Sequence, residues 1–266
     1  MMHTQSPQFL VVGTGASERR IAYIVDRQDR TGLAGLVWLP GFKSEMTSIK
    51  ASALATFANE RELPMTRFDY SGHGQSGGAF EDGCISRWLE ETRAVFSGLT
   101  AGPQIVVGSS MGGYLALLLL RSLVEASPGE AERIKALVLI APAWDMTERM
   151  WGRFSTAIKR QIEDTGVYLR PSGYGDGPYP ITRGLIEDGR RHLIGERPFN
   201  PGRPVHILHG LQDPDVPWEH TLDLVAHLDG DWTRVEAVPD GDHRLSRPED
   251  IALLGATIES LLPAAA

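Results

Sequence analysis

The chain has 266 residues, of which 42% are hydrophobic and 23% are charged. This composition is typical of globular proteins and excludes the disordered and fibrous classes. Its 26 lysines and arginines are outnumbered by 34 aspartates and glutamates, which gives a formal net charge of −8. A negative chain is poorly suited to the phosphates of nucleic acids, so we expect no nucleic-acid partner.

Cys84 is the only cysteine, which excludes an internal disulfide and a cysteine metal cluster. The first eight residues lack the basic segment and apolar run that mark a secretory signal. The apolar run at 114–120 ends at Arg121, far short of the ~18 residues that a spanning helix needs. We therefore expect a cytoplasmic protein without a membrane span, either a monomer or a homodimer.

Short apolar runs typical of strands alternate with helical patterns along most of the chain. The expected strands cover residues 9–12, 21–25, 36–39, 65–70, 105–107, 136–140, 205–208 and 235–238. The expected helices cover residues 48–61, 85–99, 111–125, 218–228 and 248–262. This alternation predicts an α/β fold with an eight-stranded, mostly parallel sheet and helices on both faces. The first two strands are too close for a helical crossover and should form an antiparallel hairpin at one end.

About sixty residues separate the strand that ends near Ile140 from the strand that begins at Val205. A connection of that length without secondary structure is uncommon in a compact domain. One amphipathic helix is predicted there by the helical spacing of Met150, Trp151, Phe154, Ile158 and Ile162.

The rest of this connection predicts further short elements. A turn-rich tip at 172–177 lies between expected strands at 167–169 and 179–181, and a second helix is expected over 183–193. We predict that residues 144–200 form a lid. The lid is inserted into a core made of residues 1–143 and 201–266.

The strongest chemical signal is the sequence GSSMG at residues 108–112, which matches the nucleophile-elbow pattern G-x-S-x-G. A serine at such a strand-to-helix turn has a strained backbone that projects its hydroxyl from the sheet. Close approach of strand and helix leaves no room for side chains two residues before and after it. Ser110 holds the central position, whereas Ser109 is out of register. Ser110 is therefore the expected nucleophile.

A serine hydroxyl needs a base to take its proton, and in chains with this elbow the acid and the histidine follow the serine. Asp213 and Asp215 follow the expected strand at 205–208, and His243 follows the expected strand at 235–238. Both loops lie at the carboxyl edge of a parallel sheet. We expect His243 to be the general base and favour Asp213 over Asp215 as the carboxylate that orients it.

A tetrahedral intermediate needs backbone N–H donors for its oxyanion. Met111 follows the nucleophile at the start of a helix and should supply one donor. The loop after the third strand reads LPGFKS at 39–44, where Gly41 permits a sharp turn. The N–H of Phe42 is the expected second donor.

Two other patterns do not point to a ligand site. GHGQSG at 72–77 matches G-x-G-x-x-G, but the helical pattern begins only near Ile85, so we expect no nucleotide there. His206 and His209 lie three apart in a strand and therefore point to opposite faces. We expect no metal and no cofactor.

Three segments together resemble landmarks of the serine α/β-hydrolase superfamily: GSSMGG at 108–113, FDYSGHG at 68–74 and HGLQDPDVP at 209–217. The resemblance covers nearly the whole chain. The segments LPGF at 39–42 and GVY at 166–168 are most similar to the palmitoyl-protein thioesterase and acyl-glucuronide esterase branch.

The resemblance implies an α/β-hydrolase fold and hydrolysis of carboxylic esters or acyl thioesters, with Ser110, Asp213 and His243 as the triad. The substrate would be a small-molecule ester or acyl thioester, and an acyl-enzyme would form on Ser110. The mitochondrial members carry an arginine-rich leader that the start of this chain lacks, so their compartment does not carry over.

Two alternatives stay open from the sequence. The same triad could serve a C–C bond hydrolase or a perhydrolase, or the fold could be a non-catalytic ligand-binding protein. Epoxide hydrolases and dehalogenases are disfavoured because they carry aspartate where this chain has Ser110. An apolar acyl pocket in the lid is suggested by Trp144, Met150, Trp151 and Phe154.

Overall fold

The computed structural model describes residues 6–26, 34–171, 177–196 and 198–262. Its strands are β1 (Gln8–Val12), β2 (Arg19–Asp26), β3 (Gly35–Leu39), β4 (Met65–Phe68), β5 (Gln104–Ser109), β6 (Ile134–Ile140), β7 (Val167–Arg170), β8 (Tyr179–Thr182), β9 (Val205–Gly210) and β10 (Thr233–Val238). Its α-helices are α1 (Ile49–Glu60), α2 (Ile85–Leu99), α3 (Met111–Ala126), α4 (Pro128–Ala131), α5 (Met146–Arg153), α6 (Thr156–Thr165), α7 (Arg183–Gly189), α8 (Trp218–His227) and α9 (Pro248–Glu259). The short 3-10 helices are η1 (Gly15–Ser17), η2 (Phe80–Asp82) and η3 (Arg190–His192).

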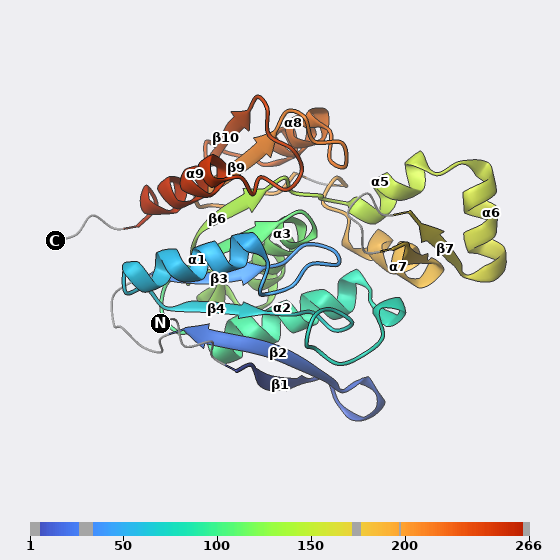
Figure 1. The fold of residues 1–266 in the computed structure, drawn as a ribbon, viewed down its shortest axis with the longest axis horizontal. Helices are drawn as coiled ribbons and strands as arrows, with labels where there is room; N and C mark the ends of the chain where they lie inside the picture. The colour runs from blue at the N-terminus through green and yellow to red at the C-terminus, as the bar shows by residue number, and fades with distance from the viewer. Residues whose placement is uncertain (1–5, 27–33, 172–176, 197, 263–266) are drawn as a thin grey trace.

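One eight-stranded sheet has the order β1-β2-β4-β3-β5-β6-β9-β10. The pairs β1–β2 and β2–β4 are antiparallel, and every other neighbouring pair is parallel. The mostly parallel sheet and the antiparallel hairpin at its end are therefore confirmed (Figure 1).

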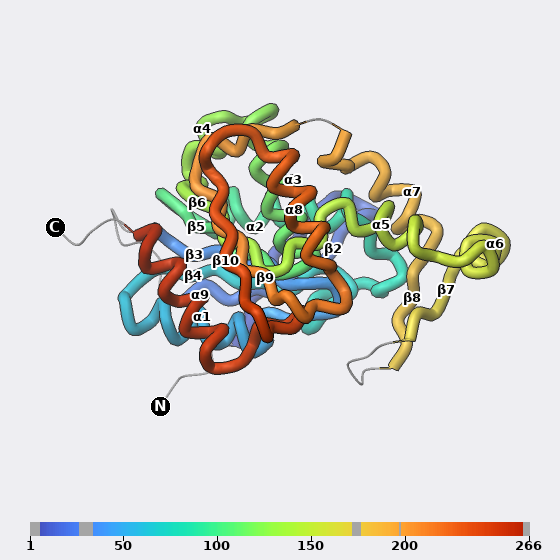
Figure 2. Tube along the Cα trace, turned by 90° about the horizontal axis from the view of Figure 1, so that it is seen from above, coloured from blue at the N-terminus to red at the C-terminus, as the bar shows by residue number. Residues whose placement is uncertain are grey.

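Alternate side chains of the central strands face two different helical layers. On β3, Leu36 and Trp38 belong to one buried cluster, and Val37 and Leu39 belong to the other. This follows from the two-residue period of a strand. The first cluster contains side chains of α1 and α9, and the second contains side chains of α2, α3 and α8. The view from above shows these two layers on opposite sides of the sheet (Figure 2).

The segment between β6 and β9 lies at one end of the molecule, beyond the carboxyl ends of the central strands (Figure 1). Its strands β7 and β8 pair antiparallel, and α7 and η3 cover residues 183–192, as the sequence predicted. Most of the expected tip at 172–177 lies outside the described residues. We call residues 144–200 the inserted segment, and its role as a lid stays a prediction.

The prediction of one amphipathic helix in this segment was wrong. The structure has two helices, α5 and α6, that are separated at Phe154 and Ser155. Phe154 has extended backbone angles, and the Ser155 hydroxyl accepts a hydrogen bond from the Ile158 N–H at 3.3 Å. Such an N-cap begins a new helix. The helical spacing of apolar residues continues across the break between α5 and α6. It does so because Met150, Phe154 and Ile158 pack against the same buried cluster.

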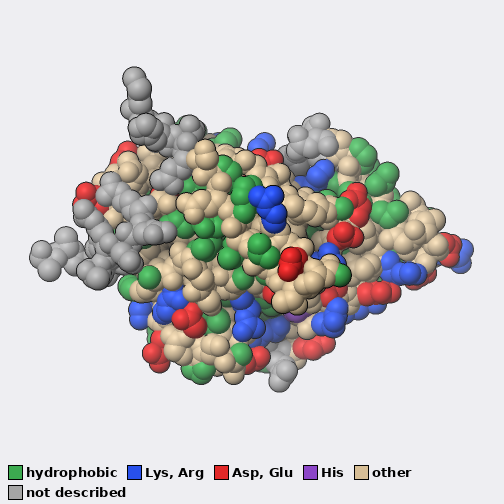
Figure 3. All heavy atoms as spheres, turned by 90° about the horizontal axis from the view of Figure 1, so that it is seen from below, with side chains coloured by type: hydrophobic (Ala, Val, Ile, Leu, Met, Phe, Trp, Pro, Cys, Tyr) green, Lys and Arg blue, Asp and Glu red, His purple; other side chains and the backbone are tan. Residues whose placement is uncertain are grey.

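No helix among the described ranges is both long and apolar enough to cross a bilayer. Acidic and basic side chains are interspersed over the lower face of the molecule (Figure 3). This face therefore carries no continuous basic surface of the kind that binds nucleic acid.

Candidate active site

Ser110 lies between β5 and α3 with φ 54° and ψ −115°. A non-glycine residue with this backbone is strained, and such strain concentrates at functional sites. A Cβ at Gly112 would lie 2.0 Å from the Leu39 carbonyl oxygen, and one at Gly108 would lie 2.3 Å from the Gly112 carbonyl oxygen. Both positions of the elbow pattern therefore require glycine.

The structure brings Ser110, His243 and Asp213 together. His243 Nε2 lies 3.1 Å from Ser110 Oγ, and His243 Nδ1 lies 2.7 Å from Asp213 Oδ2. The three residues follow β5, β10 and β9, whose carboxyl ends meet at one edge of the parallel sheet. The Asp213 side chain is 1% exposed, and the His243 side chain is 16% exposed.

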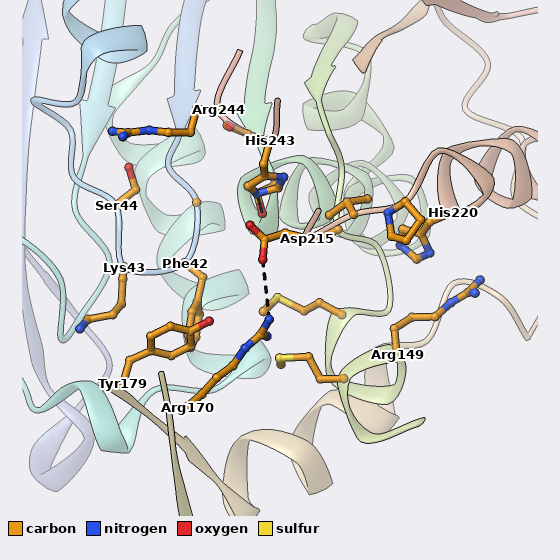
Figure 4. A pocket seen from close by; sticks show the side chains of 18 of the residues that line it. Phe42, Lys43, Ser44, Arg149, Arg170, Tyr179, Asp215, His220, His243 and Arg244 are labelled. Carbon is orange, nitrogen blue, oxygen red and sulfur yellow. Dashed lines mark hydrogen bonds and ion pairs between the residues drawn. The ribbon is translucent and has the colours of Figure 1, made fainter. Parts of the chain in front are cut away.

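The two candidate carboxylates have different partners. Asp213 Oδ1 accepts hydrogen bonds from the Asp215 and Val216 N–H groups, each at 2.8 Å, which leaves Oδ2 to contact His243. The carboxylate of Asp215 instead lies 3.6 Å from the guanidinium of Arg170 on β7 (Figure 4). The geometry thus favours Asp213 as the partner of the imidazole.

Asp213, Asp215 and His243 also form the one cluster, among the residues that the structure describes, that is dense enough to hold a metal ion. Their potential ligand atoms lie within 4.8 Å of one another. Both oxygens of Asp213 and both ring nitrogens of His243 are already engaged in the contacts above. This arrangement suits proton transfer better than metal ligation.

The loop after β3 passes directly against the elbow. A Cβ at Gly41 would lie 3.2 Å from the Ser109 carbonyl oxygen and 3.4 Å from Ser110 Cβ. In the described part of the chain, the next N–H, that of Phe42, has no backbone acceptor. The N–H of Met111 lies in the first turn of α3, where a helix offers no internal acceptor. Both predicted donors therefore lie near Ser110 without a backbone partner.

Aromatic side chains hold the Phe42 loop in place. The Phe42 ring makes edge contacts with His73, Phe80, Trp88 and Tyr179, with ring centroids 4.9 to 6.3 Å apart. Burial lowers the pKa of His73 to about 4, so this ring is neutral at pH 7. The G-x-G-x-x-G segment therefore packs beneath the loop, and α2 begins only after it, as the sequence predicted.

A cavity of about 620 Å³ opens above Ser110 and His243. Its apolar wall comes mainly from the inserted segment and is lined by Ala143, Met146, Met150, Phe154, Ile158, Tyr168 and Val216. Its polar lining comes from the core through Ser44, Ser48, Lys50, Arg244 and Ser246, and from the inserted segment through Arg149, Arg153 and Arg170.

Of the four predicted pocket residues, Met150 and Phe154 line this cavity, whereas Trp144 and Trp151 do not. Trp144 is 2% exposed, and its Nε1 donates a hydrogen bond to the His220 carbonyl oxygen at 2.8 Å. The ring of Trp151 lies under the charged groups of Lys159 and Arg190. Each tryptophan thus has structural partners, and neither lines the cavity.

Residues 36–252 match the sequence model of the alpha/beta hydrolase family. The chain belongs to the alpha/beta hydrolase family. This match and the eight-stranded, mostly parallel sheet confirm the fold class predicted from the motifs.

Similar alpha/beta hydrolases include a named enzyme. The human mitochondrial palmitoyl-protein thioesterase ABHD10 is 31% identical over 229 residues, which cover 86% of this chain and 72% of the relative. The structure of mouse ABHD10 has a TM-score of 0.84 at 30% identity, covering 97% of this chain and 98% of the mouse chain. The crystal structure of a protein from Agrobacterium vitis S4 has a TM-score of 0.93 at 40% identity, covering 97% and 98% of the two chains. The resemblance to the thioesterase branch is thereby confirmed, and the comparison supports a hydrolytic enzyme. The cytoplasmic location stays a prediction.

Sequence reasoning missed the basic side chains of this alpha/beta hydrolase that line the cavity. They are Lys43, Lys50, Arg149, Arg153, Arg170 and Arg244. Two of them could have been noticed, because Lys43 follows the expected oxyanion donor and Arg244 follows the expected base. The cavity also includes His220, whose pKa is lowered to about 4 by burial and by Arg149, so that its ring is neutral at pH 7.

Proposed function

We propose that this protein is a serine hydrolase that cleaves carboxylic esters or acyl thioesters through an acyl-enzyme on Ser110. The observation that supports this most directly is the position of the His243 ring between Ser110 Oγ and Asp213 Oδ2. In this geometry a neutral imidazole can take the serine proton while the carboxylate stabilises the imidazolium. The name of the ABHD10 relatives, palmitoyl-protein thioesterase, supports an acyl thioester as one substrate class.

The proposed reaction has two halves. Ser110 Oγ attacks the carbonyl carbon while its proton passes to His243 Nε2, and the N–H groups of Phe42 and Met111 bind the oxyanion. The C–O or C–S bond to the leaving group then breaks as His243 returns the proton to the leaving oxygen or sulfur. Water next attacks the acyl-enzyme, giving its proton to His243. Collapse of the second intermediate breaks the bond to Ser110 Oγ, which takes the proton back from His243, and releases the carboxylic acid.

The apolar wall of the cavity is the proposed site of the acyl group. Met150 and Phe154 from the inserted segment face this space together with Ile158. Apolar burial stabilises a bound acyl chain by ~0.8 kcal/mol for each methylene removed from water. Longer acyl chains should therefore bind more tightly until this part of the cavity is full.

Ser110→Ala tests the proposal, with Ser109→Ala as a matched control on the adjacent residue. The substrates are 4-nitrophenyl butyrate and the butyryl thioester of N-acetylcysteamine. We expect S110A to lower kcat by at least ~10⁴-fold, since the nucleophile acts as a unit with its base. S109A should stay within a few-fold of wild type, because Ser109 is out of register.

Labelling with a fluorophosphonate probe gives an independent readout. The wild type and S109A should each take up one equivalent, and S110A should take up none. Hydrolysis or labelling that survives in S110A contradicts the mechanism. Failure of the wild type to label would favour a non-catalytic ligand-binding protein, and turnover of vinylogous diketones instead of esters would favour C–C bond hydrolysis.

A further inference from the structure

The cavity above Ser110 is strongly basic although the chain as a whole is acidic. Six basic residues line it, and Asp215 is the one carboxylate in its described lining. Positive side chains that converge in a cleft raise the local concentration of anions. This charge contrasts with the formal net charge of −8 for the whole chain.

Among the described contacts, at least two of these six cations have carboxylate partners. Arg149 lies 3.0 Å from Asp223, and Arg170 lies 3.6 Å from Asp215. The positive charge of each arginine is therefore partly neutralised before any ligand binds. Lys50 lies outside these two pairs.

Lys50 is half-buried, and its described hydrogen-bond partners are neutral oxygens. Its Nζ donates to the carbonyl oxygen of Arg244 and to Ser246 Oγ, the latter at 3.3 Å. An ammonium has three N–H donors, so these two contacts leave one available. Burial and the neighbouring Arg244 lower the pKa of Lys50 to about 8 against the opposing effect of Asp242 and Asp250, which still leaves it largely protonated at pH 7. A partly buried cation whose hydrogen bonds go to neutral oxygens is stabilised when an anion binds beside it.

Two further buried donors line the same cavity without a partner. Trp38 Nε1 and Ser48 Oγ have no hydrogen-bond partner within the described ranges, and Trp38 is only 1% exposed. Ser48 precedes α1, makes no capping hydrogen bond, and is followed by a first turn that contains no acidic residue. Unpaired buried donors cost free energy, and an oxygen-rich anion would satisfy them together with the N-terminus of α1.

The position of these donors relative to His243 indicates which part of a substrate they would meet. Lys50 bonds the carbonyl of Arg244, the residue that follows His243. His243 must reach the leaving atom to protonate it. In the close view Arg244 and Ser44 lie on one side of His243, Arg149 lies on the other side, and Arg170 lies below His243 (Figure 4). Because the apolar wall from the inserted segment is the proposed acyl site, the core side of the cavity is the side that we assign to the leaving group.

We propose that this core side, formed by Trp38, Ser48, Lys50 and Ser246, binds a carboxylate or phosphate group carried by the alcohol or thiol that the enzyme releases. The inference rests on the proposed function, since it assigns the anion to the leaving group. It makes the enzyme selective for acyl esters or thioesters that are apolar at the acyl end and anionic at the other.

Esters with one acyl group and matched leaving groups test the proposal. They are 4-carboxyphenyl butyrate, 4-phosphonophenyl butyrate and the neutral 4-(methoxycarbonyl)phenyl butyrate. We expect the wild type to show a higher kcat/KM for at least one anionic ester than for the neutral ester. The two anionic arms distinguish a carboxylate site from a phosphate site. Equal or lower kcat/KM for both anionic esters overturns the proposal.

Lys50→Met removes the charge but keeps an unbranched side chain, and Lys135→Met is the control on an exposed position of β6. K50M should lower the ratio of kcat/KM for the anionic over the neutral ester by about tenfold, because a hydrogen bond to a charged group is lost. K135M should leave the ratio as in the wild type. A ratio within twofold of wild type in K50M overturns the proposal, and an equal loss for both esters would show that Lys50 only holds the His243 loop.

Two further measurements keep the test decisive if K50M is poorly folded or if no ester turns over. Trp38→Phe removes one buried donor at nearly constant volume and should lower the same ratio by a few-fold. Calorimetry on S110A should show tighter binding of 4-hydroxybenzoate than of its methyl ester, and K50M should abolish that difference. Anion binding without hydrolysis would refute the proposed function but support the anion site. Hydrolysis through Ser110 without any preference for anionic esters would support the proposed function but refute the anion site.

Discussion

Replacing Asp213 with asparagine tests whether Asp213 or Asp215 is the carboxylate that orients His243. The change replaces one carboxylate oxygen with an NH₂ group of similar size. Asp213 Oδ1 accepts hydrogen bonds from two backbone N–H groups at 2.8 Å, so the amide oxygen of an asparagine must occupy that position. The amide NH₂ then faces His243 Nδ1 in place of Oδ2. A donor at this point forces Nδ1 to become the acceptor and moves the ring proton to Nε2. In that tautomer His243 cannot accept the proton of Ser110.

The structure also sets the size of the effect. The opposite rotamer of the asparagine would leave two buried N–H groups facing an NH₂, at a cost of about 1–3 kcal/mol for each unpaired donor. The unreactive tautomer is therefore strongly favoured. In other serine hydrolases the same change lowers kcat by about 10⁴-fold, and we expect a similar loss here. This corresponds to about 5 kcal/mol of transition-state stabilisation.

The assay is kcat for 4-nitrophenyl butyrate, together with the rate of fluorophosphonate labelling. Asp215→Asn is the matched control, because the carboxylate of Asp215 pairs with Arg170 instead of the imidazole. D215N should remain within about tenfold of wild type, and thermal unfolding should show that both variants fold. If D213N retains a tenth of the wild-type kcat, or if D215N is the more damaged, the assignment of Asp213 is refuted.

Two further predictions concern packing and pH. Gly112→Ala should lower kcat at least ~100-fold and lower the melting temperature, because its Cβ would lie 2.0 Å from the Leu39 carbonyl oxygen beside the oxyanion loop. Gly98→Ala in α2 has no atom within 4 Å and should be neutral or stabilising by up to ~1 kcal/mol; similar losses in both variants would contradict the packing argument. The pKa of His220 is about 4 in the folded protein and ~6.5 in an unfolded chain, so only the unfolded state gains this proton as the pH falls from 6.5 to 4. Urea titrations should therefore show that wild type loses ~2 kcal/mol more stability than His220→Gln between pH 7.5 and pH 5, and equal losses would argue against a buried neutral ring.

The order of strands and helices was predictable because each element of the sheet has a strong local signal. Residues 105–107 are apolar on both faces, as in a strand buried between two helical layers. The elbow followed from the same context, since a G-x-S-x-G pattern gains meaning only between a strand and a helix. The proximity of Ser110 and His243, 133 positions apart, followed from the rule that parallel strands end at one edge.

Other features depend on contacts that local patterns do not contain. The break between α5 and α6 was hidden because the apolar residues keep their helical period across Ser155. Trp144 was expected at the cavity from its apolar character, but its indole N–H is satisfied by a backbone oxygen in the core. Asp213 and Asp215 differ in sequence only by two positions, and their partners decide between them.

The contact of Lys50 with the loop that follows His243 was equally invisible in the sequence. It lies in the first turn of an expected helix, where a lysine is ordinarily solvated. Its burial arises because the loop after His243 folds over it and supplies the carbonyl of Arg244. Such a contact joins residues that are 194 positions apart, so no sequence window could reveal it.

The chain leaves the sheet at Ile140 and returns at Val205 in the neighbouring strand, with Leu137 of β6 already paired to Val205 of β9. The whole segment between these strands therefore leaves the carboxyl end of one strand and returns to the amino end of its parallel neighbour. Evolution can lengthen, shorten or exchange such a module without moving the serine, the imidazole or the strands that carry them. The same architecture makes this segment the natural place for an engineer to graft a foreign loop and so reshape the apolar wall of the cavity.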